Sequence, residues 1–552
     1  MHAEPRRDDS TGAPPARAAE DERVDRADGR ALLLGWLALA MLPCLGYLGA
    51  ELYMLDGRIG LPLDDSWIHL QFARNLAAGA GLAYNVGERV AGSTAPLWTA
   101  LLSLGFLLPS AAMTWAKVLG VFFHLVAVAG TWRLARELDV GPALATLAAA
   151  LAATTSALVW GALSGMEVPL FTALSLWGLV LHARERGDSR RVPLSLAVLG
   201  LAALARPEGL LLVAAAVADR AFVIDRASDR LRVIAPSWRQ VLLGLALAAL
   251  ALVPVLLVYQ AIAGSPLPTT FDTKAGYSRP GLPRVRYLFE VAGVLAAAQP
   301  VATLLAPAGV LALLSRLGGP RDRGLLPALW AAGLPLAYGV LSGSGRGILG
   351  NFGRYFYPIL PVVIVLAVLG GETLLRELPR RIAVGGRDVR WPVGLVALLV
   401  LPGLGALVAG AGRYAHNVRD IEDGDVRLAR VLALRLPPEA TLAVDDIGAL
   451  KFFLPNRIVD LAGIVTPEVH AYARRSAVAT GSYCPGVLEF VRAARPDYLA
   501  IFPRHHACMS DEEFPPLLRL EVPDNITLGE GTIVVHSAPW TRFPLLPPPA
   551  AR

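Results

Sequence analysis

Charged residues are scarce in this chain. Only 17% of its 552 residues are Asp, Glu, Lys or Arg, whereas soluble domains usually carry about a quarter. Hydrophobic residues make up 55%, and the mean hydropathy is +0.51. They gather in runs such as 31–50, 115–135 and 241–258, which reach or approach the ~20 apolar residues needed to cross a bilayer. This pattern excludes a soluble protein and predicts several membrane spans.

Cysteine is also rare, with three residues in the chain. Cys44 lies inside the first apolar run and is predicted to be a small packing residue. Cys484 and Cys508 lie in the polar C-terminal region. A disulfide between them is one option there, and their spacing alone does not establish it.

Familiar catalytic motifs are missing as well. The sequence has no GxSxG elbow, no HExxH and no P-loop. His505 and His506 with Cys508 lack a second ligand cluster, so an exposed loop is predicted there. The net charge of +6 does not indicate nucleic acid binding, because the basic residues stand between apolar runs and form no single stripe.

Apolar runs and arginine-rich connections together give a topology. Residues 1–30 are predicted to be a disordered cytoplasmic tail rather than a signal peptide. The arginine-rich connections fall in every second gap, which places the N-terminus inside and everything after residue 412 outside. About eleven spans are predicted, near residues 31–54, 115–136, 142–161, 165–183, 192–205, 207–224, 241–262, 288–314, 324–341, 355–376 and 392–412.

The predicted fold is therefore a polytopic α-helical membrane protein with a small C-terminal α/β extracytoplasmic domain. The transmembrane domain covers residues 31–412 and includes a first outer loop at 55–114. Within that loop residues 97–109 are too short to span and are predicted to lie at the outer interface. Residues 413–540 alternate strand and helix patterns, which favours a partly parallel sheet, and 541–552 form a flexible tail.

Two adjacent acids, Asp64 and Asp65, stand in the first outer loop before a helical pattern at 66–78. One could cap the helix and the other lie in its first turn. The same helix carries further polar side chains close to the membrane surface, where polar groups often mark a site. These side chains are His69, Gln71, Arg74 and Asn75.

Other polar residues recur at the predicted outer ends of spans. The outer loop 264–280 holds Lys274, one of three lysines against 48 arginines. Any one charged residue at a span end can simply extend to the interface. Together they predict an outward-facing polar cavity with cations suited to a lipid phosphate. The span-end residues are Glu167, Arg206, Glu208, Arg346, Asn351, Arg354 and Tyr355.

Residues 64–99, DDSWIHLQFARNLAAGAGLAYNVGERVAGSTAPLWT, resemble the first-loop signature of bacterial GT-C membrane glycosyltransferases. These are relatives of the protein mannosyltransferases and of mycobacterial terminal arabinofuranosyltransferases. The resemblance continues through SGMEVPLF, ARPEG, GSPLPTTFDTK and GRYFYPILP, and covers most of residues 30–470. The tract AGSTAPLW departs from the aromatic or Asn-rich tract of the arabinosyl branch, which weakens arabinose as the sugar.

The resemblance implies transfer from a polyprenyl-phosphate sugar, with inversion, on the outer face of a bacterial plasma membrane. The acceptor is a cell-envelope glycan, lipid or protein. A carboxylate then serves as general base, with Asp64 slightly preferred over Asp65, and cations stabilise the leaving phosphate. Lys274, Arg74 and Arg354 are predicted for that role, and a bridging Mg²⁺ or Mn²⁺ stays open. The residues expected to line the site are His69, Asn75, Glu167, Arg206, Glu208 and Tyr355.

Two other functions stay open. A transporter or flippase of lipid-linked sugars would show internal symmetry or discontinuous helices at mid-membrane, and the sequence predicts neither. A non-catalytic scaffold that binds glycan would use the outer domain, where Asp445 and Asp446 follow a predicted strand.

Overall fold

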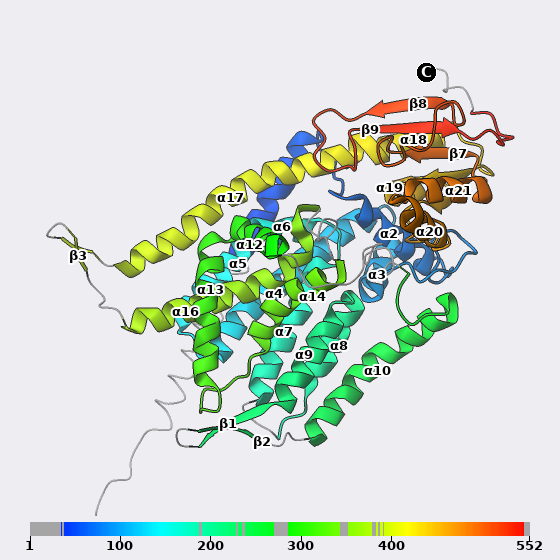
Figure 1. Cartoon of the computed structure of the whole chain (residues 1–552). Coiled ribbons are helices and arrows are strands. Elements are labelled where there is room, and N and C mark those ends of the chain that lie inside the picture. Colours follow the sequence, from blue (N-terminus) through cyan, green and yellow to red (C-terminus); the bar gives the residue numbers. More distant parts are fainter. Residues whose placement is uncertain are drawn as a thin grey trace, which may run out of the picture.

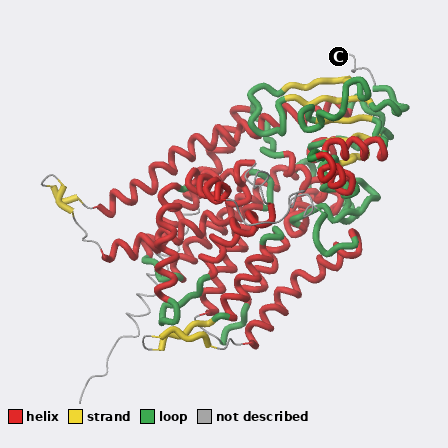
Figure 2. The backbone as a smooth tube through the Cα atoms, viewed as in Figure 1, coloured by secondary structure: helices red, strands yellow, loops and turns green. Residues whose placement is uncertain are grey.

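The computed structural model describes residues 35, 38–186, 190–227, 230–234, 238–269, 285–342, 351–377, 382–384, 387–389 and 391–545. A body of packed helices carries a small sheet at one end (Figures 1 and 2). The hairpin of β1 (Val223–Ala227) and β2 (Arg230–Ile234) lies at the opposite end of the body from that sheet (Figure 1). This hairpin belongs to an arginine-rich connection predicted to be cytoplasmic.

Apolar helices build the body. They begin with a helix at Ala38–Met54, and a second short hairpin joins β3 (Ile382–Val384) to β4 (Arg387–Val389). The remaining helices are α2 (Asp64–Ala77), α3 (Pro96–Ser103), η1 (Leu104–Leu107), α4 (Ala112–Glu137), α5 (Pro142–Thr154), α6 (Ser156–Leu163), α7 (Val168–Arg186), α8 (Leu194–Ala205), α9 (Gly209–Ala221), α10 (Trp238–Ala263), α12 (Val285–Ala298), α13 (Pro300–Arg316), α14 (Leu326–Ser342), η2 (Asn351–Ile359), α16 (Leu360–Glu377) and α17 (Trp391–Ile421).

Three helices in the described ranges are long and apolar enough to cross a membrane, and five if each of two bent pairs counts as one span. The three are α4, α10 and Phe352–Arg376. A helix lies in each of the eleven predicted ranges, but the number of spans stays a prediction. The predicted interfacial segment 97–109 forms only the short helices α3 and η1.

Two predicted spans are broken, and the expectation of continuous helices is wrong there. α5 and α6 meet at 54°, and α12 and α13 meet at 115°. Pro300 begins α13 and forces Gln299 out of the helical region, to φ −150° and ψ 81°. The Gln299 side-chain amide donates to the Thr155 hydroxyl at 2.9 Å. Thr155 stands at the break between α5 and α6, and Gln299 at the break between α12 and α13. The two breaks therefore meet through a hydrogen bond between uncharged side chains.

The C-terminal domain is a mixed α/β layer, which confirms the predicted partly parallel sheet. Its strands run in the order β6-β5-β7-β9-β8, with β6, β5 and β7 parallel and β9 antiparallel to both β7 and β8. Cys484 and Cys508 form a disulfide across this domain. The elements are η3 (Glu422–Val426), α18 (Arg427–Ala433), β5 (Thr441–Val444), α19 (Gly448–Phe453), β6 (Arg457–Asp460), α20 (Val469–Thr480), α21 (Cys484–Ala494), β7 (Tyr498–Ile501), β8 (Pro516–Glu521) and β9 (Thr532–Ser537).

Candidate active site

Asp64 joins the loop at residues 55–114 to the C-terminal domain. Its two carboxylate oxygens accept the backbone N–H groups of Gly448 at 2.6 Å and Ala449 at 2.7 Å. These are the first two residues of α19, whose N–H groups have no partner within the helix. Burial raises the pKa of Asp64 to about 7, although both N–H groups act to lower it. The carboxyl therefore holds two domains together.

Gly448 is required for this approach. A Cβ at Gly448 would stand 2.1 Å from the Asp64 carbonyl oxygen and 2.8 Å from each carboxylate oxygen. Such contacts are far inside ordinary van der Waals separation, so a side chain at this position forces α19 away from α2.

Asp65 is the accessible member of the acid pair. Its side chain is 37% exposed and forms an ion pair with Arg354, which is 5% exposed. The Arg354 guanidinium also lies over the Tyr355 ring, 5.5 Å from its centroid. A carboxylate at a partly exposed position can meet an incoming hydroxyl, whereas both Asp64 oxygens already accept hydrogen bonds.

A second arginine extends this charged array. The Arg206 guanidinium stands 5.0 Å from the Tyr355 centroid, 3.2 Å from Glu208 Oε1 and 3.5 Å from Glu167 Oε1. His69 Nε2 lies 3.1 Å from Glu167 Oε2. The structure thus brings together six of the predicted site residues, namely His69, Glu167, Arg206, Glu208, Arg354 and Tyr355.

Several donors of this array are buried without a hydrogen-bond partner among the described residues. They include Arg354 Nη1 and Arg206 Nη1. Buried polar groups in proteins nearly always form hydrogen bonds, so buried donors without a partner indicate a position where a ligand or water can bind. Two such guanidinium donors in the array that includes Asp65 suit an anionic group such as a phosphate.

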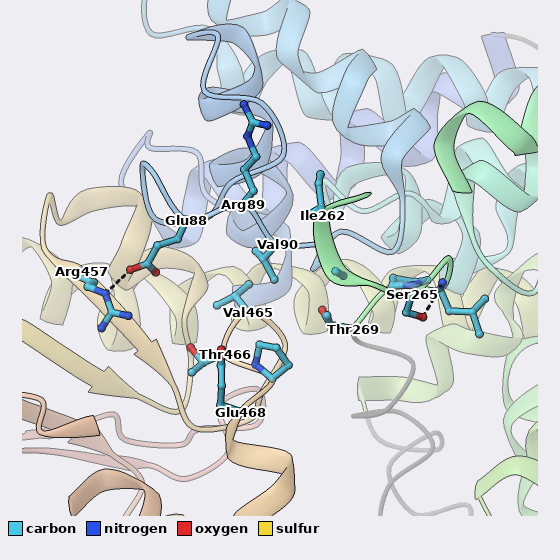
Figure 3. Close-up of a pocket in the computed structure, with 14 residues that line it drawn as sticks. Glu88, Arg89, Val90, Ile262, Ser265, Thr269, Arg457, Val465, Thr466 and Glu468 are labelled. Carbon is cyan, nitrogen blue, oxygen red and sulfur yellow. Dashed lines mark hydrogen bonds and ion pairs between the residues drawn. The ribbon is translucent and has the colours of Figure 1, made fainter. Parts of the chain in front are cut away.

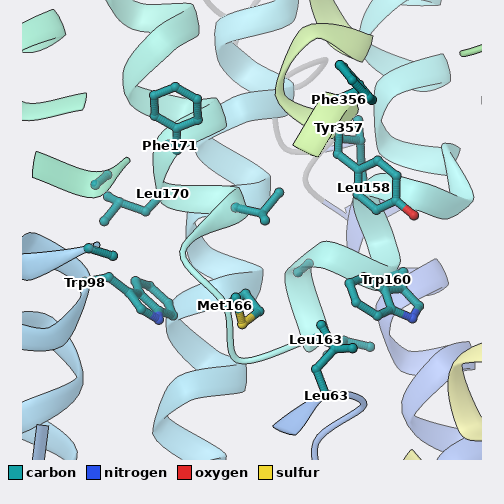
Figure 4. Packing of buried hydrophobic residues seen from close by; sticks show 14 of the residues in the cluster. Leu63, Trp98, Leu158, Trp160, Leu163, Met166, Leu170, Phe171, Phe356 and Tyr357 are labelled. Atoms are coloured by element: carbon teal, nitrogen blue, oxygen red, sulfur yellow. The ribbon is translucent and has the colours of Figure 1, made fainter. Parts of the chain in front are cut away.

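An apolar cluster fixes the segments that carry these side chains (Figure 4). Leu63 precedes Asp64, Met166 precedes Glu167 and Phe356 follows Tyr355, and all three are at most 5% exposed. Figure 4 shows them in one packed group. The polar array therefore stands on a rigid base contributed by three distant parts of the chain.

Other predicted site residues serve the scaffold instead. Arg74 donates to the Phe452 carbonyl at 2.8 Å and stacks on the Phe452 ring, so its predicted contact with phosphate has no support in its position. Asn75 holds the glycine-rich loop through the carbonyls of Ala83 and Tyr84. Lys274 lies outside the described residues, and its role stays a prediction.

Sequence reasoning missed two contributors. Tyr338 on α14 bonds Glu208 through its hydroxyl, and its ring packs edge-on against Tyr355. Gly448 supplies the N–H that receives Asp64. Tyr338 lies inside an apolar run and Gly448 follows a strand pattern almost 400 residues from Asp64, so neither carried a local signal.

Further acids gather where the sheet meets α2. Burial raises the pKa of Asp425 and Asp446 well above the ordinary range, and that of Asp460 to about 6. His506 belongs to the same edge, pairs with Asp445 at 2.5 Å and is 4% exposed. The predicted exposed loop is wrong for His506, because this pairing with Asp445 draws the imidazole inward.

The donor set around Asp65 fits a divalent metal poorly. Asp64 is occupied by backbone N–H groups, and Asp65 is paired with Arg354. Across the described ranges no group of three His, Cys, Asp or Glu side chains is placed to hold a metal ion.

Comparison with solved structures identifies this architecture. ArnT from Cupriavidus metallidurans aligns at 15% identity over 91% of this chain and 98% of its own, with a TM-score of 0.55. The Archaeoglobus fulgidus oligosaccharyltransferase aligns at 13% identity over 84% of this chain and 69% of its own, with a TM-score of 0.52. The chain has the GT-C fold.

Within this GT-C chain, residues 413–541 match a family model described as a domain of unknown function (DUF8728). No curated protein matches the sequence. The shared fold agrees with the family resemblance of residues 64–99.

Proposed function

We propose that the protein is a membrane glycosyltransferase that moves a sugar from a polyprenyl-phosphate donor to a cell-envelope acceptor. One observation carries the proposal. A partly exposed carboxylate, Asp65, pairs with the buried Arg354, and the buried Arg206 contacts the same Tyr355 ring as Arg354. Both arginines keep an N–H group that has no hydrogen-bond partner among the described residues. This pairs a base for a hydroxyl with donors for a phosphate inside a GT-C fold.

Asp65 is the general base in this proposal, rather than Asp64 as the sequence slightly favoured. The acceptor hydroxyl attacks the anomeric carbon and passes its proton to the Asp65 carboxylate. The bond from that carbon to the phosphate oxygen breaks, and the lipid phosphate leaves with the electron pair. Attack opposite the leaving group inverts the anomeric carbon. Asp64 acts as a positioning residue that fixes the start of α2.

Arg354 and Arg206 stabilise the departing phosphate. Negative charge grows on this group as the bond breaks, and donors fixed in advance stabilise it without reorganisation. Glu167 and Glu208 hold the Arg206 guanidinium in place. His69 contacts Glu167 through Nε2 and so helps to fix this array, and Lys274 stays a predicted contact of the phosphate.

The outer side of the membrane is the proposed site of transfer. The disulfide between Cys484 and Cys508 is typical of an oxidising compartment. The arginine-rich β1–β2 connection lies at the opposite end of the body (Figure 1), as the positive-inside bias expects. Both features favour a membrane enzyme with its C-terminal domain outside, and the family resemblance adds the bacterial plasma membrane to this proposal.

A transporter of lipid-linked sugars is the second candidate, because helices broken within the body are typical of transporters. Here the facing breaks meet through neutral Thr155 and Gln299, while the charged array lies at the junction with the outer domain. This separation favours chemistry at the junction.

The test uses purified protein in lipid with a panel of polyprenyl-phosphate sugars and measures release of the lipid phosphate. Asp65→Asn is expected to lower the rate by about 10²–10⁴-fold, the range for a lost general acid–base group, with the fold intact. Asp511→Asn, an exposed acid of the outer domain, is the matched control. Full activity in Asp65→Asn would refute the proposed base, and transport of uncleaved donor would favour the transporter.

A further inference from the structure

A cavity of about 610 Å³ opens where three outer segments meet (Figure 3). Its walls come from the first outer loop at Glu88–Val90, from residues 262–269 at the outer end of α10, and from Val465–Glu468 before α20. Arg457, the first residue of β6, completes the lining. The volume lies in the range of sites that bind small organic ligands.

The walls of this cavity are tied to one another. Thr269 donates its N–H to the Ala91 carbonyl at 3.0 Å and its hydroxyl to the Ile464 carbonyl at 2.8 Å. Glu88 and Arg457 form an ion pair at 2.5 Å, drawn as a dashed line in Figure 3. The cavity is therefore already formed before any ligand arrives.

The lining has two kinds of surface. Val90, Ile262 and Val465 give apolar patches, and four charged side chains of both signs stand among them. Two of the four, Arg89 and Glu468, make no side-chain hydrogen bond or ion pair within the described ranges and are exposed. Sugars match this mixture, because their hydroxyls bond carboxylates and guanidinium groups while their C–H faces pack on apolar side chains.

A peptide and a lipid tail fit the cavity less well. β6 is the edge strand of the sheet, and an extended peptide would pair with that edge. Asn85 already occupies it, because its side chain bonds both the N–H and the carbonyl of Ile458, at 3.0 and 2.9 Å. A hydrocarbon tail would leave the charged side chains without water or partners.

The cavity wall lies against α2 beyond the proposed base. A Cβ added at Gly92 would lie 3.0 Å from both the Phe72 ring of α2 and the Val465 side chain of the cavity wall, so these two side chains flank Gly92. Phe72 follows Asp65 by seven residues on this helix, which is about 10 Å at 1.5 Å per residue. A sugar ring in the cavity is thus not the ring that reacts, but one farther along the same acceptor.

We infer that the cavity is an acceptor subsite for the second and later rings of an oligosaccharide, which makes a glycan chain the acceptor class. The inference rests on the proposed glycosyl transfer. Glu468 and Arg89 are the side chains that recognise the glycan beyond its reacting end.

The test compares octyl glycosides of one, two and three mannopyranosyl or arabinofuranosyl residues, using full-length protein in lipid. Binding is measured by calorimetry and transfer by release of lipid phosphate. The disaccharide is expected to bind and react about tenfold better than the monosaccharide, the gain for one hydrogen bond to a charged group. Glu468→Gln or Arg89→Gln should reduce this ratio to near one.

Matched controls are Glu439→Gln, which lies before β5, and Arg519→Gln on β8, both exposed and outside the cavity. They should keep the tenfold ratio. Equal binding of all chain lengths, no binding of either series, or an unchanged ratio in Glu468→Gln and Arg89→Gln would each overturn the subsite. If the unmodified protein cleaves none of the donors, the proposed function is refuted, and the binding measurement still decides the subsite.

Discussion

Replacing Gly448 with alanine should separate the C-terminal domain from α2. The new methyl group would lie 2.1 Å from the Asp64 carbonyl oxygen, so α19 has to move by about 1 Å to restore normal contact. That shift lengthens the bonds from Gly448 and Ala449 to the Asp64 carboxylate, now 2.6 and 2.7 Å. Each such hydrogen bond contributes about 0.5–1.5 kcal/mol, so the docked state should lose about 1–3 kcal/mol.

Hydrogen exchange in lipid measures this change. Faster exchange is expected in α19 and the first turn of α2, together with slower donor cleavage because Asp65 follows Asp64 directly. Gly412→Ala is the control, since this exposed helical glycine has open space at its Cβ position. Exchange rates in Gly448→Ala equal to those of the control would show that the contact with Asp64 does not hold the two domains together.

Three further outcomes are expected. The pKa of Asp64 is raised from 3.8 to about 7, so between pH 4 and pH 7 the folded state holds more protons than the unfolded state, and stability should fall as pH rises. Asp64→Asn should flatten the dependence of the melting temperature on pH. An unchanged slope in this variant would contradict the prediction. Reduction of the Cys484–Cys508 disulfide, which closes a loop across 24 positions, should destabilise the C-terminal domain by about 3 kcal/mol in denaturant titration. An identical unfolding midpoint would argue against it. Thr155→Val leaves the buried Gln299 amide unpaired and should cost about 1–3 kcal/mol; Gln299→Leu added to it should recover part of the loss, and a strictly additive loss would refute this pairing.

Much of the fold follows from local sequence patterns. Apolar runs predicted helices because a bilayer requires about twenty such residues, and the alternation after residue 412 predicted the mixed sheet. The broken helices show the limit of this reasoning. Apolar content is the same on both sides of Gln299, and only the position of Pro300 at a helix start turns one expected span into a 115° bend.

The sequence by itself determined which side chains are candidates for the site, because charged residues are rare in so apolar a chain. Six of them meet in one array, His69, Glu167, Arg206, Glu208, Arg354 and Tyr355. The tertiary structure alone decided their roles. Asp64 and Asp65 are chemically identical neighbours, yet packing against α19 buries one under two backbone N–H groups and leaves the other 37% exposed beside Arg354. That difference depends on the contacts of Asp65 with Arg354 and of Asp64 with Gly448, which are 289 and 384 residues apart in the sequence. No local sequence pattern encodes such contacts.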